Sequence, residues 1–333
     1  MVRRLTVGLT ALLFIALASG AWAISEGGAI FLMIRPGARA AGMGSAFVAI
    51  ADDATAAYFN PGGLAFLDRR ELALMHSPWL NNIWRDVGDL YYEFAAYVQP
   101  VKGWGTVGGS LIFLSEGRSQ QTDRDGNVLG EFSSYEMAPH LSYGTKVGRN
   151  VGLGGNFKIV YSHLYPGHLD DSPGTGVGTT WAFDFGLLYK GPIKRLSWGV
   201  TVQNVGPKLV YLSTPGENGD PLSRNLRVGT AYRLMDNRVS KWVLTADATK
   251  MLLNLNDPMR AQLYEVVTHL GTEFVYSDLL ALRTGYVTDE AGHIKGPTFG
   301  GGVLVKRFSF DYGMEPGGEL QKYNQKFSLS VKF

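Results

Sequence analysis

Alternation of apolar and polar residues dominates the chain from residue 70 onward. In the last segment Phe327, Leu329, Val331 and Phe333 are apolar, and the residues between them are polar. A period of two places the two kinds of side chain on opposite faces of an extended strand. We predict fourteen such strands, at 70–78, 90–99, 104–114, 132–146, 150–162, 180–190, 195–205, 224–235, 239–249, 261–276, 279–288, 297–305, 307–313 and 322–333.

Two architectures give this alternation. In a soluble sandwich the apolar face forms the core, whereas in a membrane barrel it meets lipid. Three features favour the barrel. Several segments reach the ten or so residues that a tilted membrane strand needs. The polar face carries charges of both signs among many small residues. Aromatic residues such as Trp104, Trp181 and Tyr276 lie at many strand ends, as in the girdles at the two membrane surfaces.

The connections between the strands alternate in length. The short ones are 100–103, 147–149, 191–194, 235–238, 277–278 and 306, and the long ones are 79–89, 115–131, 163–179, 206–223, 250–260, 289–296 and 314–321. Short periplasmic turns and long outer loops are typical of outer-membrane barrels. The pattern therefore predicts an all-β fold, a 14-stranded antiparallel transmembrane β-barrel, over residues 70–333.

The first 23 residues have the features of a secretory signal peptide. Arg3 and Arg4 precede an apolar stretch, and Ala21-Trp22-Ala23 forms a small-x-small cleavage site. The alternative is an uncleaved anchor. No later stretch approaches the length of a membrane helix. We expect an exported protein of a Gram-negative-type outer membrane, with a periplasmic protein as the alternative.

Composition excludes several other classes. The chain has no cysteine, which excludes disulfides and thiolate metal sites. Charged residues make up 18%, below the roughly 25% of soluble domains. Loss of the two signal-peptide arginines leaves 29 basic and 29 acidic residues. This balance argues against a nucleic-acid partner.

Residues 24–69 are rich in alanine and glycine and lack strand alternation. Asp52 is expected to cap a short helix that runs through Tyr58 and is stopped by Pro61 and Gly62. Small residues allow such a segment to pack closely inside a lumen. We therefore predict an N-terminal plug, or hatch, before the barrel.

The stretch GARAAGMGSAFVAIADDATAAYFNPGGLAFL, at 37–67, resembles the opening of the PorV/PorQ family, within the wider group of FadL-like outer-membrane proteins. Segments 123–127, 203–207, 219–229 and 279–286 extend the resemblance. The plug motif comprises Gly37, Arg39, Gly42, Gly44, Asp52, Asp53, Asn60, Pro61 and Gly62. The wider group usually has Asn-Pro-Ala where this chain has Asn60-Pro61-Gly62.

The resemblance implies a fourteen-stranded barrel with an N-terminal plug. For PorV it implies a role in type IX secretion, in which the barrel accepts exported proteins by their C-terminal domain. For FadL-like relatives it implies passage of lipophilic compounds through the barrel wall. Our first hypothesis is docking or shuttling of exported proteins, and the alternative is a transporter of hydrophobic small molecules.

Charges on the predicted inner face are the other candidate site. They are Lys158, Asp184, Arg227, Arg233, Asp247, Glu273, Arg283, Arg307 and Asp311. They fit either a translocation path or, as we favour, a self-neutralising network that holds the plug. Asp52 and Asp53 could likewise form a functional acid cluster, although capping and a plug contact are favoured.

We expect no enzyme, cofactor or metal. The chain lacks the G-x-S-x-G, H-E-x-x-H and P-loop patterns, so an outer-membrane enzyme is the weakest alternative. His163 and His168 share a loop with two aspartates, and Asp123-x-Asp125-x-Asn127 resembles the start of a calcium loop. A solvated loop and a tight turn explain these features more simply.

The expected partners are outer-membrane lipid, the barrel-assembly machinery, secreted proteins and type IX secretion components. Phe333, at the close of an amphipathic strand, resembles the C-terminal signal that the assembly machinery reads.

Overall fold

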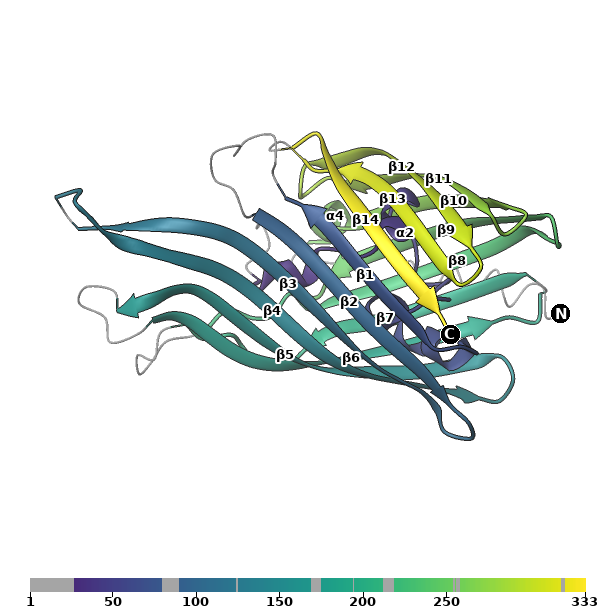
Figure 1. The fold of residues 1–333 in the computed structure, drawn as a ribbon. Helices are drawn as coiled ribbons and strands as arrows, with labels where there is room; N and C mark the ends of the chain where they lie inside the picture. Colours follow the sequence, from purple (N-terminus) through teal and green to yellow (C-terminus); the bar gives the residue numbers. More distant parts are fainter. Residues whose placement is uncertain are drawn as a thin grey trace.

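The fold is a single closed β-barrel. The computed structural model describes residues 27–79, 90–123, 125–168, 175–193, 195–211, 219–253, 255, 258–318 and 321–333. Fourteen antiparallel strands within this part pair in sequence order, and the first pairs with the last to close the barrel (Figure 1). This confirms the predicted fold class. The predicted signal peptide, 1–23, lies outside the described residues.

The elements are as follows. The strands are β1 (Glu71–Pro78), β2 (Leu90–Val101), β3 (Gly105–Thr122), β4 (Val128–Val147), β5 (Val151–His168), β6 (Thr175–Lys190), β7 (Leu196–Val205), β8 (Asn225–Asp236), β9 (Ser240–Met251), β10 (Val267–Tyr276), β11 (Leu280–Asp289), β12 (Ile294–Val305), β13 (Phe308–Pro316) and β14 (Tyr323–Lys332). The helices are η1 (Ile30–Met33), α2 (Ala38–Gly42), α3 (Ala56–Phe59), η2 (Pro61–Phe66) and α4 (Met259–Tyr264). No helix in the described ranges is long and apolar enough to cross a membrane.

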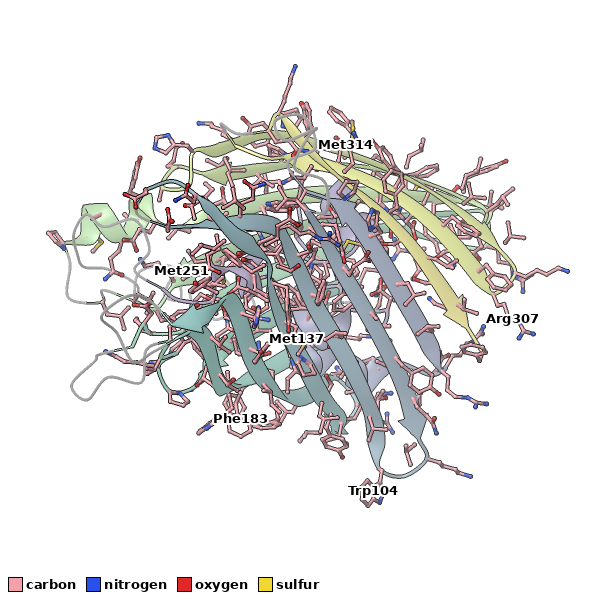
Figure 2. All side chains as sticks on the ribbon, turned by 60° about the vertical axis from the view of Figure 1, so that its left-hand side comes forward. Trp104, Met137, Phe183, Met251, Arg307 and Met314 are labelled. Carbon is pink, nitrogen blue, oxygen red and sulfur yellow. The ribbon has the colours of Figure 1, made fainter. Side chains whose placement is uncertain are left out.

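The alternation divides each strand between the lumen and the outer wall. In β6 the Asp184 side chain faces inward and the residue is 1% exposed, whereas Phe185 is 57% exposed on the outside. Phe183, also on the outside, is labelled in Figure 2. Aromatic rings continue across neighbouring strands, as in the row from Tyr91 through Phe113 to Tyr135, with centroids about 6 Å apart. The outer wall is therefore apolar and aromatic, as a lipid-facing surface requires.

Two of the predicted long loops are largely strand. Segment 115–131 was expected to be a loop, but β3 continues to Thr122 and β4 begins at Val128. Likewise β5 continues to His168 and β6 begins at Thr175 within the predicted loop 163–179. Outside the membrane neither face needs to be apolar, so the hydrophobic alternation ends although the strand pairing continues. We call this side of the barrel the long-hairpin end and the opposite side the short-turn end. Trp104 and Arg307 lie at the short-turn end (Figure 2).

The strand predicted at 261–276 was wrong in its first part. Residues 259–264 form helix α4, and β10 begins only at Val267. Pro258 occupies the N-cap position of this helix. Proline has no N–H to donate, which suits a helix start better than a strand interior.

Residues 30–66 lie inside the barrel, where most of them are buried (Figure 1). Helix α2 contacts β11 to β14, and η2 contacts β3 to β6 on the other side of the lumen. The expected helix cap at Asp52 was wrong, because α3 begins only after Thr55. The nearby turn is held instead by Asp53, whose Oδ1 accepts from the backbone N–H of Thr55 at 2.9 Å.

Candidate functional site

Glycines on the barrel strands allow the N-terminal segment to approach the wall. A Cβ at Gly42 would lie 2.8 Å from the Cα of Gly300, closer than real Cβ contacts come. Gly44 has φ +64°, and a Cβ there would lie 2.5 Å from the carbonyl oxygen of Leu270. The strand glycines that meet this segment are Gly144, Gly152, Gly154, Gly186, Gly199, Gly271, Gly285, Gly300 and Gly313. The contact is therefore backbone against backbone over much of the circumference.

The turn Asn60-Pro61-Gly62 fixes the end of the segment. The Asn60 Nδ2 donates to the carbonyl oxygens of Val48 and Leu187, and its Oδ1 accepts from the Gly62 N–H at 3.0 Å. A Cβ at Gly62 would lie 2.8 Å from the carbonyl oxygen of Gly152. This crowding leaves no room for a side chain at position 62.

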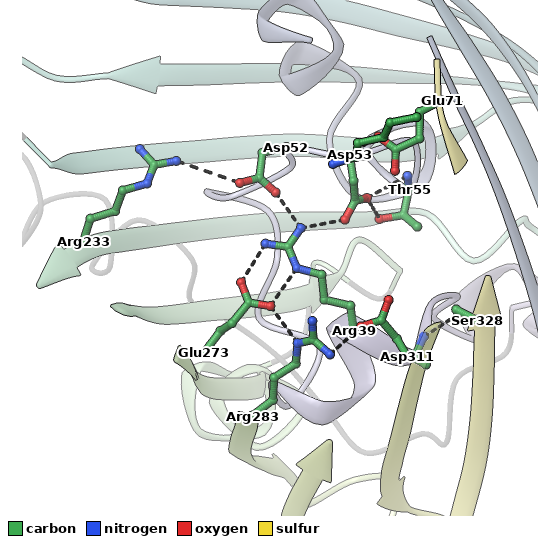
Figure 3. A network of polar contacts seen from close by, with 12 residues as sticks. Arg39, Asp52, Asp53, Thr55, Glu71, Arg233, Glu273, Arg283, Asp311 and Ser328 are labelled. Carbon is green, nitrogen blue, oxygen red and sulfur yellow. Dashed lines mark hydrogen bonds and ion pairs between the residues drawn. The ribbon is translucent and has the colours of Figure 1, made fainter. Parts of the chain in front are cut away.

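Arg39 forms the centre of a charged network (Figure 3). Its guanidinium donates to Asp52 at 2.7 Å, to Asp53 at 2.8 Å and, through Nε and Nη2, to both oxygens of Glu273. Burial alone would lower the pKa of Arg39, but the carboxylates of Asp52, Glu273 and Asp53 more than offset it and raise that pKa well above its ordinary value. Arg39 therefore stays charged and ties the segment to β10.

The network continues to the neighbouring strands. Glu273 also accepts from Arg283 Nε at 2.6 Å, and Arg283 Nη1 donates to Asp311 at 2.7 Å. On the other side Arg233 lies 3.9 Å from Asp52. Figure 3 shows these side chains converging from β8, β10, β11 and β13 on the N-terminal segment.

This network lines a cavity of about 510 Å³ at the short-turn end. Arg39, Asp52 and Glu273 contribute to its wall, and Lys306 and Asp278 contribute from the turns. The chamber is thus lined by a group of charged side chains together with apolar ones such as Met75 and Phe94, and residues of the N-terminal segment form part of its wall.

Other predicted inner charges are buried beside the same segment. Lys158 and Asp184 form an ion pair at 2.9 Å, with side chains 3% and 1% exposed. The Asp247 Oδ2 accepts from the backbone N–H groups of Phe47 and Val48 at 2.7 and 2.9 Å.

The remaining two predicted inner charges, Arg227 and Arg307, differ from each other in burial. Arg227 is buried, and its Nη2 donates to the Tyr58 hydroxyl at 3.2 Å. Arg307 was expected in the lumen, but it is an exposed residue of the turn before β13 and lines only the chamber's rim. The alternation was extended one residue too far, because the strand itself begins at Phe308.

The buried inner-face groups that were not anticipated include Lys326, Glu315 and Glu71. Lys326 is paired with Glu315, and its Nζ also donates to the Arg35 carbonyl oxygen at 2.6 Å. Glu71 lies 3.7 Å from Lys332. Lys326 lies in the same alternation phase as the polar residues Ser328 and Ser330, and this signal could have placed it on the inner face.

The chain is similar to a known family and a known fold. The family model described as "Type IX secretion system protein PorV" matches residues 21–258. The chain belongs to the PorV family. A comparison with curated proteins finds no match.

Among solved structures, the Ralstonia pickettii toluene transporter TbuX has a TM-score of 0.58 at 14% identity, and the match covers 90% of this chain and 98% of that one. The Pseudomonas putida toluene transporter TodX has a TM-score of 0.57 at 15% identity, with the same two coverages. At this identity the likeness concerns the fold. Family and fold are those of outer-membrane transport and secretion barrels rather than of enzymes.

The candidate metal positions have simpler explanations where they are described. Asp123 accepts hydrogen bonds from the N–H groups of Asp125 and Asn127 and from the Asn127 side chain, which lower its pKa. Its carboxylate therefore stabilises the hairpin turn. Within the described residues no group of three potential metal-ligating side chains occurs. The aspartates beside His163 and His168, at 170 and 171, lie outside those residues.

Phe333 follows β14 at the short-turn end. Its N–H donates to the Arg70 carbonyl oxygen at 2.9 Å, and the residue is 55% exposed. An assembly signal at this residue stays a prediction.

Proposed function

We propose that this outer-membrane barrel docks exported proteins in type IX-like secretion, with its N-terminal segment acting as a plug. The observation that carries the proposal is the length of β3 to β6. These strands have 16 to 20 residues, whereas β7, β10, β11 and β14 have 10. Ten residues suffice to cross a bilayer, so the excess projects about 25 Å along the strand.

The projecting β3–β4 hairpin has the surface of a docking element. A register shift between Ser115 and Arg118, with Gly117 at φ +79°, marks the bulge where it leaves the wall. Near its tip Val128 and Leu129 are 60% and 62% exposed. Figure 1 shows the hairpin extending beyond the rest of the long-hairpin end. Exposed apolar side chains on a projecting hairpin suit contact with a protein partner.

The alternative, a transporter of hydrophobic small molecules, is less well supported by the interior. The fold resembles that of two toluene transporters. However, the chamber at the short-turn end is lined in part by the charged residues Arg39, Asp52 and Glu273. An apolar solute that passed these groups would displace the water that hydrates them, which costs free energy. We therefore place the alternative second.

Shortening the hairpin tests the proposal. A variant in which 119–132 is replaced by Asn-Gly joins Arg118 to Ser133, which are already paired. We expect normal abundance in the outer membrane but loss of exported proteins that copurify with the barrel. In the control only the turn residues 123–127 are replaced, so that the full lengths of β3 and β4 are kept. This control should retain the copurifying proteins.

Unchanged copurification in the shortened variant would contradict docking by this hairpin. Loss of toluene uptake with exported proteins still attached would favour the transporter. The secreted proteins, type IX components and barrel-assembly machinery are the partners that this proposal names.

A further inference from the structure

Positive charge is concentrated around the short-turn end of the barrel. Each turn at this end, apart from that between β10 and β11, carries at least one exposed cation, and these include Lys102, Arg149, Arg195, Arg238, Lys306 and Arg307. Arg69 and Arg70, before β1, and Lys332, at the end of β14, are also exposed and continue the series. Among the described residues at this end, the exposed acids are Asp68, Asp236 and Asp278.

This excess of cations does not follow from the composition of the chain. The whole sequence is nearly balanced, with 31 basic and 29 acidic residues. At the long-hairpin end the charges are mixed, and the exposed acids in the described part, Asp125, Glu131, Asp220 and Glu290, are nearly as many as the exposed bases. The short-turn end therefore differs from the rest of the surface in the sign of its charge.

The cations are densest where β12, β13, β14 and β1 end. The Lys332 N–H donates to the Arg307 carbonyl oxygen at 2.8 Å, and the Phe333 N–H donates to that of Arg70 at 2.9 Å. Neighbouring strands lie about 4.8 Å apart, so Arg70, Lys332 and Arg307 begin within about 10 Å of one another. Arg307 lies at this edge in Figure 2. Neither Arg70, Lys306 nor Arg307 forms an ion pair with another described residue.

Exposed aromatic residues lie at the same level as these cations. Trp104 is 71% exposed and shares a turn with Lys102, while Phe308 directly follows Arg307 and Phe333 directly follows Lys332. Aromatic residues at the strand ends of a membrane barrel mark the level of the lipid headgroups. The cations beside them are therefore placed within reach of lipid phosphates.

We propose that the short-turn end binds the phosphate groups of anionic phospholipids in the leaflet that surrounds it. Arginine and lysine side chains bind phosphate through charge-assisted hydrogen bonds. Headgroups surround a barrel on every side, whereas an acidic protein would meet one sector of it. Cations distributed over nearly all the turns suit the lipid surface better. The proposal does not depend on whether the barrel docks exported proteins.

Spin-labelled lipids test the proposal on the purified full-length barrel in phosphatidylcholine vesicles. At low ionic strength, spin-labelled phosphatidylglycerol should associate with wild type at least about threefold more strongly than spin-labelled phosphatidylcholine. Sodium chloride at about 1 M should weaken this preference, because it shortens the screening length to about 3 Å.

A variant and a matched control locate the site. The rim variant combines Arg70→Gln, Lys306→Gln and Arg307→Gln and should lose at least about half of the preference. Because these side chains are exposed and unpaired, its unfolding temperature should stay near that of wild type. The control combines Arg118→Gln, Lys208→Gln and Lys322→Gln, three exposed cations of the long-hairpin end. It removes the same charge and should keep the wild-type preference.

Three results would overturn the proposal. The first is equal association of the two lipids with wild type, and the second is an equal loss of preference in the rim variant and the control. The third is an acidic protein that copurifies with wild type but not with the rim variant, without any lipid preference. That third result would assign the surface to a protein partner.

Discussion

The two ends of the barrel differ in structure, although the same antiparallel strands form both. At the short-turn end, strands finish within the membrane thickness and enclose a charged chamber centred on Arg39 and Glu273. At the long-hairpin end, β3 to β6 continue well beyond the length that a bilayer requires. The first end is built for internal contact with the N-terminal segment, and the second offers surface to other molecules.

The difference shows how each end satisfies its polar groups. Charges in the chamber are partly removed from bulk water, which favours pairing with one another, and Arg39 pairs with three acids. The hairpin is surrounded by water, so Arg118 and Glu131 need no partner and both are exposed. Changes at the short-turn end should therefore alter closure and stability, and changes at the hairpin should alter partners.

Removal of the N-terminal segment should have the largest effect. Deletion of 28–58, or Gly44→Trp at a position with no room for a side chain, should displace the segment and leave an open, charged lumen. In planar bilayers wild type should be nearly closed and both variants should conduct. Gly130→Trp is the control, since a Cβ at Gly130 meets nothing within 4 Å. Equal conductance in wild type and the deletion would contradict a plug.

Loss of the Arg39 charge should have a smaller effect than loss of the N-terminal segment. Its effect on stability should still be large for a single side chain. Arg39→Ala would leave Asp53 and Glu273 without their shared partner and should lower the free energy of unfolding by about 2–4 kcal/mol, a range reduced for the partial exposure of Asp52. Arg39→Lys keeps the charge but loses the planar set of donors. Its free energy of unfolding should therefore lie between those of wild type and Arg39→Ala. Urea titration of the detergent-solubilised barrel measures both. If Arg39→Ala is as stable as wild type, the network does not hold the segment.

The sequence predicts the barrel well because lipid imposes a strict rule. Each membrane strand must be apolar on one face, so β14 could be located from Phe327 to Phe333 alone. The rule ends with the bilayer, and the extensions of β3 and β4 were therefore mistaken for a loop. Asp52 has the usual chemistry of a helix cap, but it pairs with Arg39, a contact that local sequence does not reveal.

A substitution in the projecting hairpin should have the smallest effect on stability. Two leucines of the same strand allow the hairpin to be compared directly with the lipid-facing wall. Leu129 and Leu141 both belong to β4 and are 62% and 69% exposed. We place Leu129 in water, at the docking surface, and Leu141 on the lipid-facing wall. Leu129→Ser should change the free energy of unfolding by no more than about 0.5 kcal/mol. It should still weaken capture of exported proteins several-fold, because it removes an exposed apolar contact.

Leu141→Ser is the matched control. It should leave capture unchanged and reduce the stability of the barrel in lipid vesicles, because it places a hydroxyl in the apolar wall. Copurification measures capture, and unfolding in vesicles measures stability. If the two serine variants behaved alike in both measurements, Leu129 and Leu141 would lie in the same environment. That result would contradict the assignment of the hairpin to a docking surface in water.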